Sequence, residues 1–215
     1  MLFITKDGSH SIFNAQYQTP YHSYLGAIEE SKHVFIKNGI DAYFQNQELI
    51  NVLEIGFGTG LNALLSMIHA EFNNYKIVYT AIEPYPLSID IVKQLNYCKL
   101  LNISQNNLLK IHKNYTSGLF EIKHIRDELQ NINLPNNFDV IYFDAFSPNT
   151  QKEMWSVDLF RQIFNSLNQN GFLVTYCAKG DVKRALKSAG FVVKALAGPP
   201  RKREMIKAFK LSMTL

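Results

Sequence analysis

The stretch NVLEIGFGTGLNALL, residues 51–65, decides the fold of this chain. The apolar run at residues 50–55 has the length and β-branched content of a buried parallel strand, and the residues after Gly60 carry apolar side chains three and four apart, as in a helix on a sheet. Gly56 and Gly58 lie in the turn between this strand and this helix. Glycine permits positive φ and close approach of a ligand, and a helix N-terminus offers free N–H groups to an anion. The stretch therefore predicts a strand–turn–helix unit that binds a small anionic cofactor.

The same alternation of strand and helix continues along the chain. Short apolar runs rich in β-branched or aromatic residues alternate with segments of helical periodicity, so right-handed crossovers would build a doubly wound, mostly parallel α/β sheet. The predicted strands are residues 50–55, 77–82, 138–143 and 172–177, and the predicted helices are residues 61–70, 87–95, 157–167 and 181–189.

The two ends of the chain depart from this alternation. Residues 191–196 and 205–211 are strand-like, but AGPPRKRE between them leaves no room for a helix, which predicts an antiparallel hairpin at the end of the sheet. Residues 1–48 predict a lid with a short strand and a helix at residues 23–37. We expect this lid and the core, residues 49–215, to form a single domain.

Composition places the chain among soluble globular proteins. Of its 215 residues, 47% are hydrophobic and 19% are charged, which excludes a disordered chain. The sequence has no run of eighteen apolar residues and no basic-then-apolar leader, so we expect a cytoplasmic protein without a membrane partner. Cys98 and Cys177 predict buried thiols, and the six histidines show no metal-ligand spacing, so no metal is predicted.

Basic charge is concentrated near the carboxyl end. Residues 179–210 hold ten of the 22 Lys and Arg residues and only two acidic ones, a net charge of +8, whereas the rest of the chain carries −4. This split indicates either a polyanionic partner or a solvated helix face beside a basic edge strand, with equal weight from charge alone.

The glycine spacing discriminates between nucleotide cofactors. A dinucleotide loop would need a third glycine at the position of Leu61, so the spacing disfavours NAD. Glu54, two residues before the first glycine, instead resembles the acidic residue of S-adenosylmethionine sites. That cofactor has an ammonium and a carboxylate but no phosphate, so acidic groups beside the loop suit it. We therefore predict S-adenosyl-L-methionine, held by Glu54, Gly56, Gly58 and Gly60.

Two more acidic residues follow strands on the cofactor side. Glu83 ends the second strand, where a carboxylate can accept hydrogen bonds from both ribose hydroxyls. Asp127, in HIRDEL after a weaker strand, stands where this fold often contacts the adenine amino group, or else caps the next helix.

The predicted catalytic residue is Asp144, at the end of the strand FDVIYFD. Ligands of open α/β sheets lie at the carboxyl ends of strands. Phe146 adds an aromatic face and Pro148 a rigid turn, in a loop that resembles the Asp-Pro-Pro-Tyr loop of amino methyltransferases. Methyl transfer to nitrogen needs an unprotonated lone pair in line with the S–CH3 bond, so we expect Asp144 to orient an amine and accept one of its hydrogens. Ser156 is the nearer candidate cap for the following helix.

Four segments together resemble one family, the MnmC-type methyltransferases that complete 5-methylaminomethyl-2-thiouridine at the tRNA wobble position. They are YHSYLGAIEESKHVFI, LEIGFGTGLNAL, YFDAFSPNTQKEMW and GPPRKREM, so the resemblance runs from Tyr21 almost to the end. It implies a Rossmann-like class I methyltransferase acting on the primary amine of 5-aminomethyl-2-thiouridine in the anticodon region of tRNA. It also implies that Glu30 is a cofactor-side carboxylate. The resemblance does not identify RNA contacts, and the basic cluster Arg201, Lys202 and Arg203 is our candidate for them.

Several alternatives stay open. The sequence ends after the methyltransferase segment, so it resembles the free-standing version of the family, and an oxidase activity, where needed, would come from a separate protein. The alternative function is transfer to another amine, including aminopropyl transfer, although the basic end favours RNA over a polycationic amine. A non-catalytic RNA-binding protein would not need Asp144 or the glycine loop. No Ser-centred nucleophile elbow or P-loop lysine is present, which argues against hydrolases and kinases. Residues 96–120 match no motif.

Overall fold

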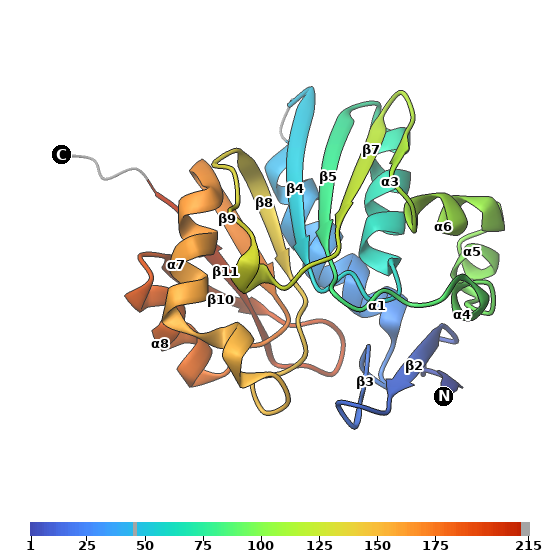
Figure 1. Ribbon diagram of the computed structural model, residues 1–215, viewed down its shortest axis with the longest axis horizontal. Coiled ribbons are helices and arrows are strands. Elements are labelled where there is room, and N and C mark those ends of the chain that lie inside the picture. Colours follow the sequence, from blue (N-terminus) through green and yellow to red (C-terminus); the bar gives the residue numbers. More distant parts are fainter. Residues whose placement is uncertain (45–46, 212–215) are drawn as a thin grey trace.

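The computed structural model describes residues 1–44 and 47–211, which form an α/β sheet with helices on both faces (Figure 1). The strands of the core sheet are β4 (Leu49–Ile55), β5 (Lys76–Ile82), β6 (Tyr115–Thr116), β7 (Phe120–Ile125), β8 (Phe138–Phe143), β9 (Leu167–Thr175), β10 (Val192–Ala197) and β11 (Glu204–Phe209). Within the described ranges their order is β10-β11-β9-β8-β4-β5-β7-β6. The central strands β9, β8, β4, β5 and β7 are parallel, whereas β6 and the β10–β11 hairpin pair antiparallel. The predicted sheet, parallel with a final antiparallel hairpin, is confirmed.

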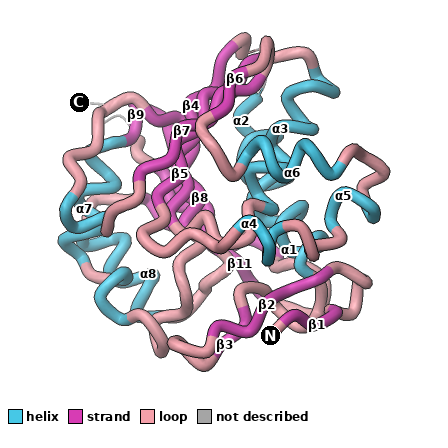
Figure 2. Tube along the Cα trace, turned by 45° about the vertical axis from the view of Figure 1, so that its right-hand side comes forward, coloured by secondary structure: helices cyan, strands magenta, loops and turns pink. Residues whose placement is uncertain are grey.

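Helices cover both faces of this sheet (Figure 2). One face carries α1 (Ala27–Ser31), its π-helical continuation η1 (Lys32–Ile40), α2 (Asp41–Phe44), α3 (Leu61–Asn73) and α6 (Gln105–Ile111), and the other carries α7 (Val157–Ser166) and α8 (Gly180–Ser188). Short turns of helix lie in the connections: α4 (Ile89–Val92), α5 (Tyr97–Leu100), η2 (Leu129–Asn131) and η3 (Lys152–Trp155).

Strand alternation explains the two cores. Successive residues of a strand point to opposite faces. Val52 accordingly packs in the core under η1 and α3, and Leu53 packs in the core under α7 and α8; both are fully buried. Strand β8 is buried at all six positions, five of them apolar and the other Asp139, as expected for a sheet covered on both faces.

The N-terminal segment differs from the prediction of one strand and one helix. It forms a three-stranded antiparallel sheet of β1 (Leu2–Ile4), β2 (His10–Asn14) and β3 (Thr19–Pro20), which lies below the core sheet in Figure 1. The helix begins at Ala27 rather than at residue 23 and continues to Ile40. It departs from helical geometry at Gly39, where a Cβ would lie 2.9 Å from the ring of Tyr142. The close packing of that ring explains the kink.

Two other elements have different bounds from those predicted. The helix predicted at residues 87–95 is shortened to α4. The chain then turns, and the side chain of Asn96 accepts a hydrogen bond from His10 N and donates one to Gly8 O. Strand β9 begins at Leu167 rather than at residue 172, with a register shift against β8. Its carboxyl end, followed by Tyr176 and Cys177, lies beside the end of β8.

Candidate active site

Backbone geometry accounts for the three glycines after β4. Gly56, Gly58 and Gly60 have φ angles of 88°, 52° and 75°, in the left-handed region that glycine adopts without strain. A Cβ on Gly56 would lie 2.7 Å from the backbone oxygen of Asp144. The first glycine therefore lets the loop pass against the end of β8. The predicted cofactor loop and the predicted catalytic residue are in contact.

The backbone of the loop and its neighbour orients Glu83. Its Oε2 accepts a hydrogen bond from Gly58 N at 3.0 Å, and its Oε1 accepts one from Tyr85 N at 3.0 Å. Burial raises the pKa of Glu83, and the two backbone donors oppose that rise. Glu83 thus lines the cavity beside the glycine loop, and its ribose-binding role stays a prediction.

Glu54, Asn62 and Asp144 form a polar cluster in which Glu54 and Asn62 are buried and Asp144 is half-buried. Asn62 Nδ2 donates to Glu54 Oε1 and to Asp144 Oδ2, at 2.9 Å in each case. Burial raises the pKa of both carboxyls well above the ordinary range, and the charge of Asp144 adds to the rise at Glu54. Among the described residues, Asn62 Oδ1 and Glu54 Oε2 have no partner within hydrogen-bond geometry, and the buried Tyr79 hydroxyl lies close enough to Glu54 to lower the pKa of its carboxyl. A buried acceptor without a donor is costly, so the cavity side of this cluster, Asn62 and Asp144, suits a cationic or hydrogen-donating group.

A cavity of about 300 Å³ opens on Asn62 and Asp144 of this cluster, whereas the fully buried Glu54 does not line it. Its walls come from the glycine loop, the ends of β5 and β8, the turn at residues 128–130, the loop at residues 151–154 and the N-terminal segment. The polar lining residues include Asn14, His22, Asn62, Glu83, Glu128, Asp144 and Gln151, and the aromatic ones are Tyr17, Tyr21, Phe57, Tyr85 and Phe146. The volume lies at the lower end of the range for small-molecule sites.

The N-terminal segment closes one side of the cavity. A Cβ on Gly58 would lie 2.9 Å from the ring of Tyr21, and the Tyr21 and Phe146 rings lie 5.2 Å apart between centroids. His22 Nε2 lies 3.4 Å from Thr59 Oγ1, and burial lowers the pKa of His22 to about 4, so the imidazole is neutral at pH 7. Contacts of the glycine loop with an aromatic residue and a neutral histidine thus hold the segment over the site.

The structure separates the other predicted residues into two groups. Phe146 lines the cavity, and its carbonyl accepts a 2.8 Å hydrogen bond from Trp155 Nε1, while Pro148 follows it without lining the cavity. Asp127 does not line the cavity either. Its Oδ1 accepts hydrogen bonds from Glu128 N at 2.7 Å and Asn131 Nδ2 at 2.9 Å, and Glu128 takes the place on the cavity wall.

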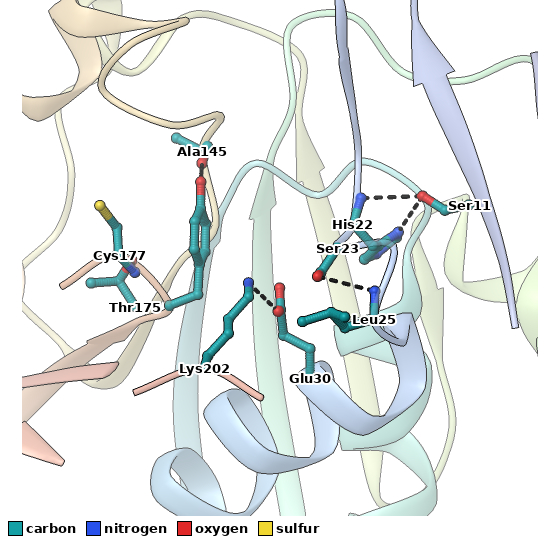
Figure 3. A network of polar contacts seen from close by, with 10 residues as sticks. Ser11, His22, Ser23, Leu25, Glu30, Ala145, Thr175, Cys177 and Lys202 are labelled. Atoms are coloured by element: carbon teal, nitrogen blue, oxygen red, sulfur yellow. Dashed lines mark hydrogen bonds and ion pairs between the residues drawn. The ribbon is translucent and has the colours of Figure 1, made fainter. Parts of the chain in front are cut away.

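Glu30 and the basic cluster lie beside the site. Glu30 is ion-paired with Lys202, and Figure 3 shows the two side chains pointing toward each other. Arg201 and Arg203, on either side of Lys202, are exposed. Ser156, not Asp144, caps α7 by accepting from Leu159 N at 3.3 Å.

Sequence reasoning missed the cavity residues Tyr17, Tyr21, His22 and Asn62. Two signals could have found some of them. Asn62 is the polar residue in the first turn of an otherwise apolar helix, directly after the loop. Tyr21 and His22 open the segment YHSYLGAIEESKHVFI, but nothing in their spacing places them on the glycine loop.

The donor set fits S-adenosyl-L-methionine. The carboxyl of Asp144 and the unpartnered Oδ1 of Asn62, both on the cavity wall, suit a ligand with an ammonium group, and the buried Glu54 adds an acidic group behind Asn62. Glu83 suits a ribose, and the first turn of α3 faces the cavity through Leu61 and Asn62, where free N–H groups suit a carboxylate. Across residues 1–44 and 47–211 no helix is long and apolar enough to cross a membrane. Those residues also form no cluster of three His, Cys, Asp or Glu side chains suited to a metal ion.

Comparison with known proteins agrees with this site. Two curated relatives are each called tRNA 5-methylaminomethyl-2-thiouridine biosynthesis bifunctional protein MnmC. The protein from Burkholderia multivorans is 27% identical over 91% of this chain and 33% of its own length, and that from Campylobacter hominis is 30% identical over 92% and 31%. The chain spans about a third of the length of these relatives.

A solved structure and a family model extend the comparison. The crystal structure of MNMC2 from Aquifex aeolicus superimposes with a TM-score of 0.80 at 25% identity, covering 96% of this chain and 69% of that one. A family model described as S-adenosyl-L-methionine-dependent methyltransferase matches residues 88–211. The predicted cofactor and enzyme class are therefore confirmed, and the chain belongs to this family of S-adenosyl-L-methionine-dependent methyltransferases.

Proposed function

We propose that this enzyme methylates the primary amine of 5-aminomethyl-2-thiouridine at the wobble position of tRNA. The observation that carries the proposal is similarity over nine-tenths of the chain to relatives whose name states the synthesis of 5-methylaminomethyl-2-thiouridine in tRNA. A cavity with a buried carboxylate on one wall and aromatic rings on another supports an amine attached to a flat base.

Four groups would hold the cofactor. Glu83 would accept from the ribose hydroxyls, the first turn of α3 would receive the carboxylate, and Asn62, oriented by the buried Glu54, would accept a hydrogen from the ammonium. When bound, S-adenosyl-L-methionine supplies an electrophilic methyl group on a sulfonium. On transfer the sulfur would keep the electron pair of the broken S–C bond and become a neutral thioether, and the positive charge would pass to the amine nitrogen.

Asp144 would orient the amine. A neutral amine attacks through its lone pair, forming the N–C bond, and its hydrogens must point away from the methyl group. An ionised Asp144 on the cavity wall accepts one of those hydrogens and stabilises the positive charge that develops on nitrogen. A proton then leaves the methylated ammonium for the carboxylate or water. Because burial raises the pKa of Asp144, the ionised form needed for this role is favoured toward higher pH.

The aromatic rings and the exposed arginines would bind the RNA. Tyr17 and Phe146, with centroids 4.9 Å apart on the cavity wall, offer faces on which a base out of its stack can pack. Arg201 and Arg203 offer charge to the anticodon-loop phosphates. The N-terminal segment, residues 1–48, would act as a lid over a core of residues 49–215 in a single domain, in the cytoplasm where tRNA is modified.

A reconstituted methylation tests the proposal. The protein is incubated with methyl-labelled S-adenosyl-L-methionine and either tRNA carrying 5-aminomethyl-2-thiouridine, the same tRNA with an unmodified wobble uridine, or a polyamine. Nucleosides are then identified by mass spectrometry. We expect label only in 5-methylaminomethyl-2-thiouridine. Label in the polyamine and none in RNA would overturn the substrate assignment in favour of another amine.

A further inference from the structure

One ion pair joins the two ends of the chain beside the active site. Lys202, in the turn between β10 and β11, pairs with Glu30 of α1 (Figure 3). Their side chains are only 28% and 12% exposed, in contrast to the surface pair Lys93–Asp90 at 56% and 89%. A surface ion pair contributes little to folding stability. Removing either partner of a largely buried ion pair leaves an uncompensated buried charge, which is destabilising. The Lys202–Glu30 pair is therefore a structural tie between α1 and the hairpin.

Tyr176 connects the Lys202–Glu30 ion pair to the segment that carries the predicted catalytic residue, Asp144. Lys202 Nζ lies 5.3 Å from the centroid of the Tyr176 ring, a cation–π distance. Tyr176 follows β9, and its hydroxyl donates a 3.0 Å hydrogen bond to the carbonyl of Ala145. Ala145 directly follows Asp144, so the ring braces the peptide that carries the cavity-lining carboxylate.

The charges of the pair also reach Asp144. Glu30 raises the pKa of Asp144 and Lys202 lowers it, after the larger effect of burial and the opposing hydrogen bond from Asn62. Burial, with the charges of Asp144 and Glu30, raises the pKa of Tyr176. The same two side chains thus hold the Asp144–Ala145 peptide and influence the carboxylate of Asp144 through charges of opposite sign.

We infer that Glu30 and Lys202 are positioning residues for methyl transfer: their ion pair, acting through Tyr176, fixes the Asp144–Ala145 peptide and balances the charge beside it. This inference rests on the proposed function. It gives Lys202 a role different from that of its neighbours, because Arg201 and Arg203 are exposed and can reach RNA while Lys202 points inward to Glu30.

The groups that face Asp144 come from every element around it, and they fix the sign of each test. Asn62 of α3 donates to Asp144 and to Glu54 of β4. Glu30 of α1 and Lys202 of the hairpin turn affect the pKa of Asp144 through their charges, and the charge of Asp144 affects the pKa of Tyr176 after β9. Removing Lys202 leaves negative charge near Asp144 and raises the pKa of its carboxyl. Removing Glu30 deletes that negative charge and lowers the pKa of the Asp144 carboxyl.

Two variants of the full-length protein, Lys202→Met and Glu30→Gln, test the inference. The pKa of Asp144 is measured by carbon-13 NMR of protein labelled in the aspartate carboxyls, with Asp144→Asn to assign the signal. We expect shifts of about one unit in opposite directions, upward for Lys202→Met and downward for Glu30→Gln. The double variant should return near the wild-type value. Shifts in the same direction, or none, would overturn the inference.

Single-turnover methylation gives the second readout. Both variants should be slower at saturating RNA and cofactor, by roughly tenfold, because misplacement of a catalytic group by a fraction of an ångström is costly. Lys202→Arg, which keeps the charge, should recover most of the rate. Arg203→Met is the matched control from the same turn, and it should raise KM for tRNA while leaving the Asp144 titration unchanged.

The two failures are distinguishable. A wild-type protein that does not methylate the modified tRNA contradicts the proposed function. The NMR titration still tests whether the Lys202–Glu30 pair influences Asp144. A wild-type protein that methylates it, with a Lys202→Met variant that behaves like Arg203→Met in both readouts, makes Lys202 a phosphate contact and contradicts the inference. Circular dichroism and thermal melting establish that each variant compared is folded.

Discussion

Asn62 Nδ2 donates a 2.9 Å hydrogen bond to Oδ2 of Asp144, and the same nitrogen donates to Glu54 at 2.9 Å. One amide thus serves the buried carboxyl of Glu54 and the half-buried carboxyl of Asp144, and loss of solvation raises the pKa of both. Neither carboxyl has a cation in direct contact among the described residues, so the protein bears the cost of their charge before any ligand binds.

Replacing Glu54 by Gln should change how stability depends on pH. A carboxyl whose pKa is raised on folding contributes its full stability below the unfolded pKa, 4.5 for Glu, and loses it as pH rises toward the folded pKa. Gln keeps the acceptor for Asn62 and does not ionise. The variant should therefore gain stability over the wild type as pH rises from 4 to 8, by about 1.4 kcal/mol for each unit of raised pKa.

Urea unfolding at several pH values measures this difference. The free energies of unfolding of wild type and Glu54→Gln should be closest near pH 4 and diverge above it. A constant difference between them at every pH would mean that Glu54 does not titrate with a raised pKa in the folded protein. Calorimetry should meanwhile find weaker binding of S-adenosyl-L-methionine to the variant, since the carboxyl that orients Asn62 on the cavity wall is replaced.

Gly58→Val should abolish binding of S-adenosyl-L-methionine. Valine would be strained at a φ of 52°, and its Cβ would lie 2.9 Å from the Tyr21 ring on the cavity wall. The matched control is Gly118→Val, because Gly118 has no positive φ and no heavy atom within 4 Å of an added Cβ. Isothermal titration should detect binding to the control only. Unchanged affinity in a folded Gly58→Val protein would remove the loop from the cofactor site.

Replacing Arg201 and Arg203 together by Gln should weaken tRNA binding and make it less sensitive to salt. Each lost phosphate contact should lower the log–log salt slope by roughly 0.7 to 0.9. Affinity for S-adenosyl-L-methionine should stay the same, since both side chains are exposed outside the cavity. Filter binding across a salt series measures the slope. If it equals that of the wild type, the two arginines belong to the solvated surface.

The sequence predicted those parts of the site that follow from strand ends. The glycine loop, Glu83 and Asp144 each come directly after a buried apolar run, and parallel strands bring their carboxyl ends to one edge of a sheet. The sequence does not show which of two adjacent residues at a strand end faces the cavity. Asp127 turns back to bond with Asn131, so Glu128 lines the cavity instead.

Contacts between distant segments were beyond prediction from the sequence. Tyr21 and His22 lie on the glycine loop because the N-terminal strands fold back over it, and no period in the chain encodes that docking. Charge density near the carboxyl end also does not say that Lys202 turns inward while Arg203 stays exposed. The side-chain direction in a turn depends on its partner, Glu30, which is known only from the folded chain.

Asp144→Asn tests the central role assigned to the carboxylate that receives the amine hydrogen. Asn is nearly isosteric, so the fold should persist, but the charge that stabilises the developing ammonium is lost. The measurement is single-turnover methylation of tRNA carrying 5-aminomethyl-2-thiouridine at saturating S-adenosyl-L-methionine, with calorimetry to verify cofactor binding. We predict a rate lower by roughly a hundredfold or more, about 2.7 kcal/mol, with cofactor affinity changed much less. A rate near that of the wild type would contradict the account and make Asp144 a structural residue.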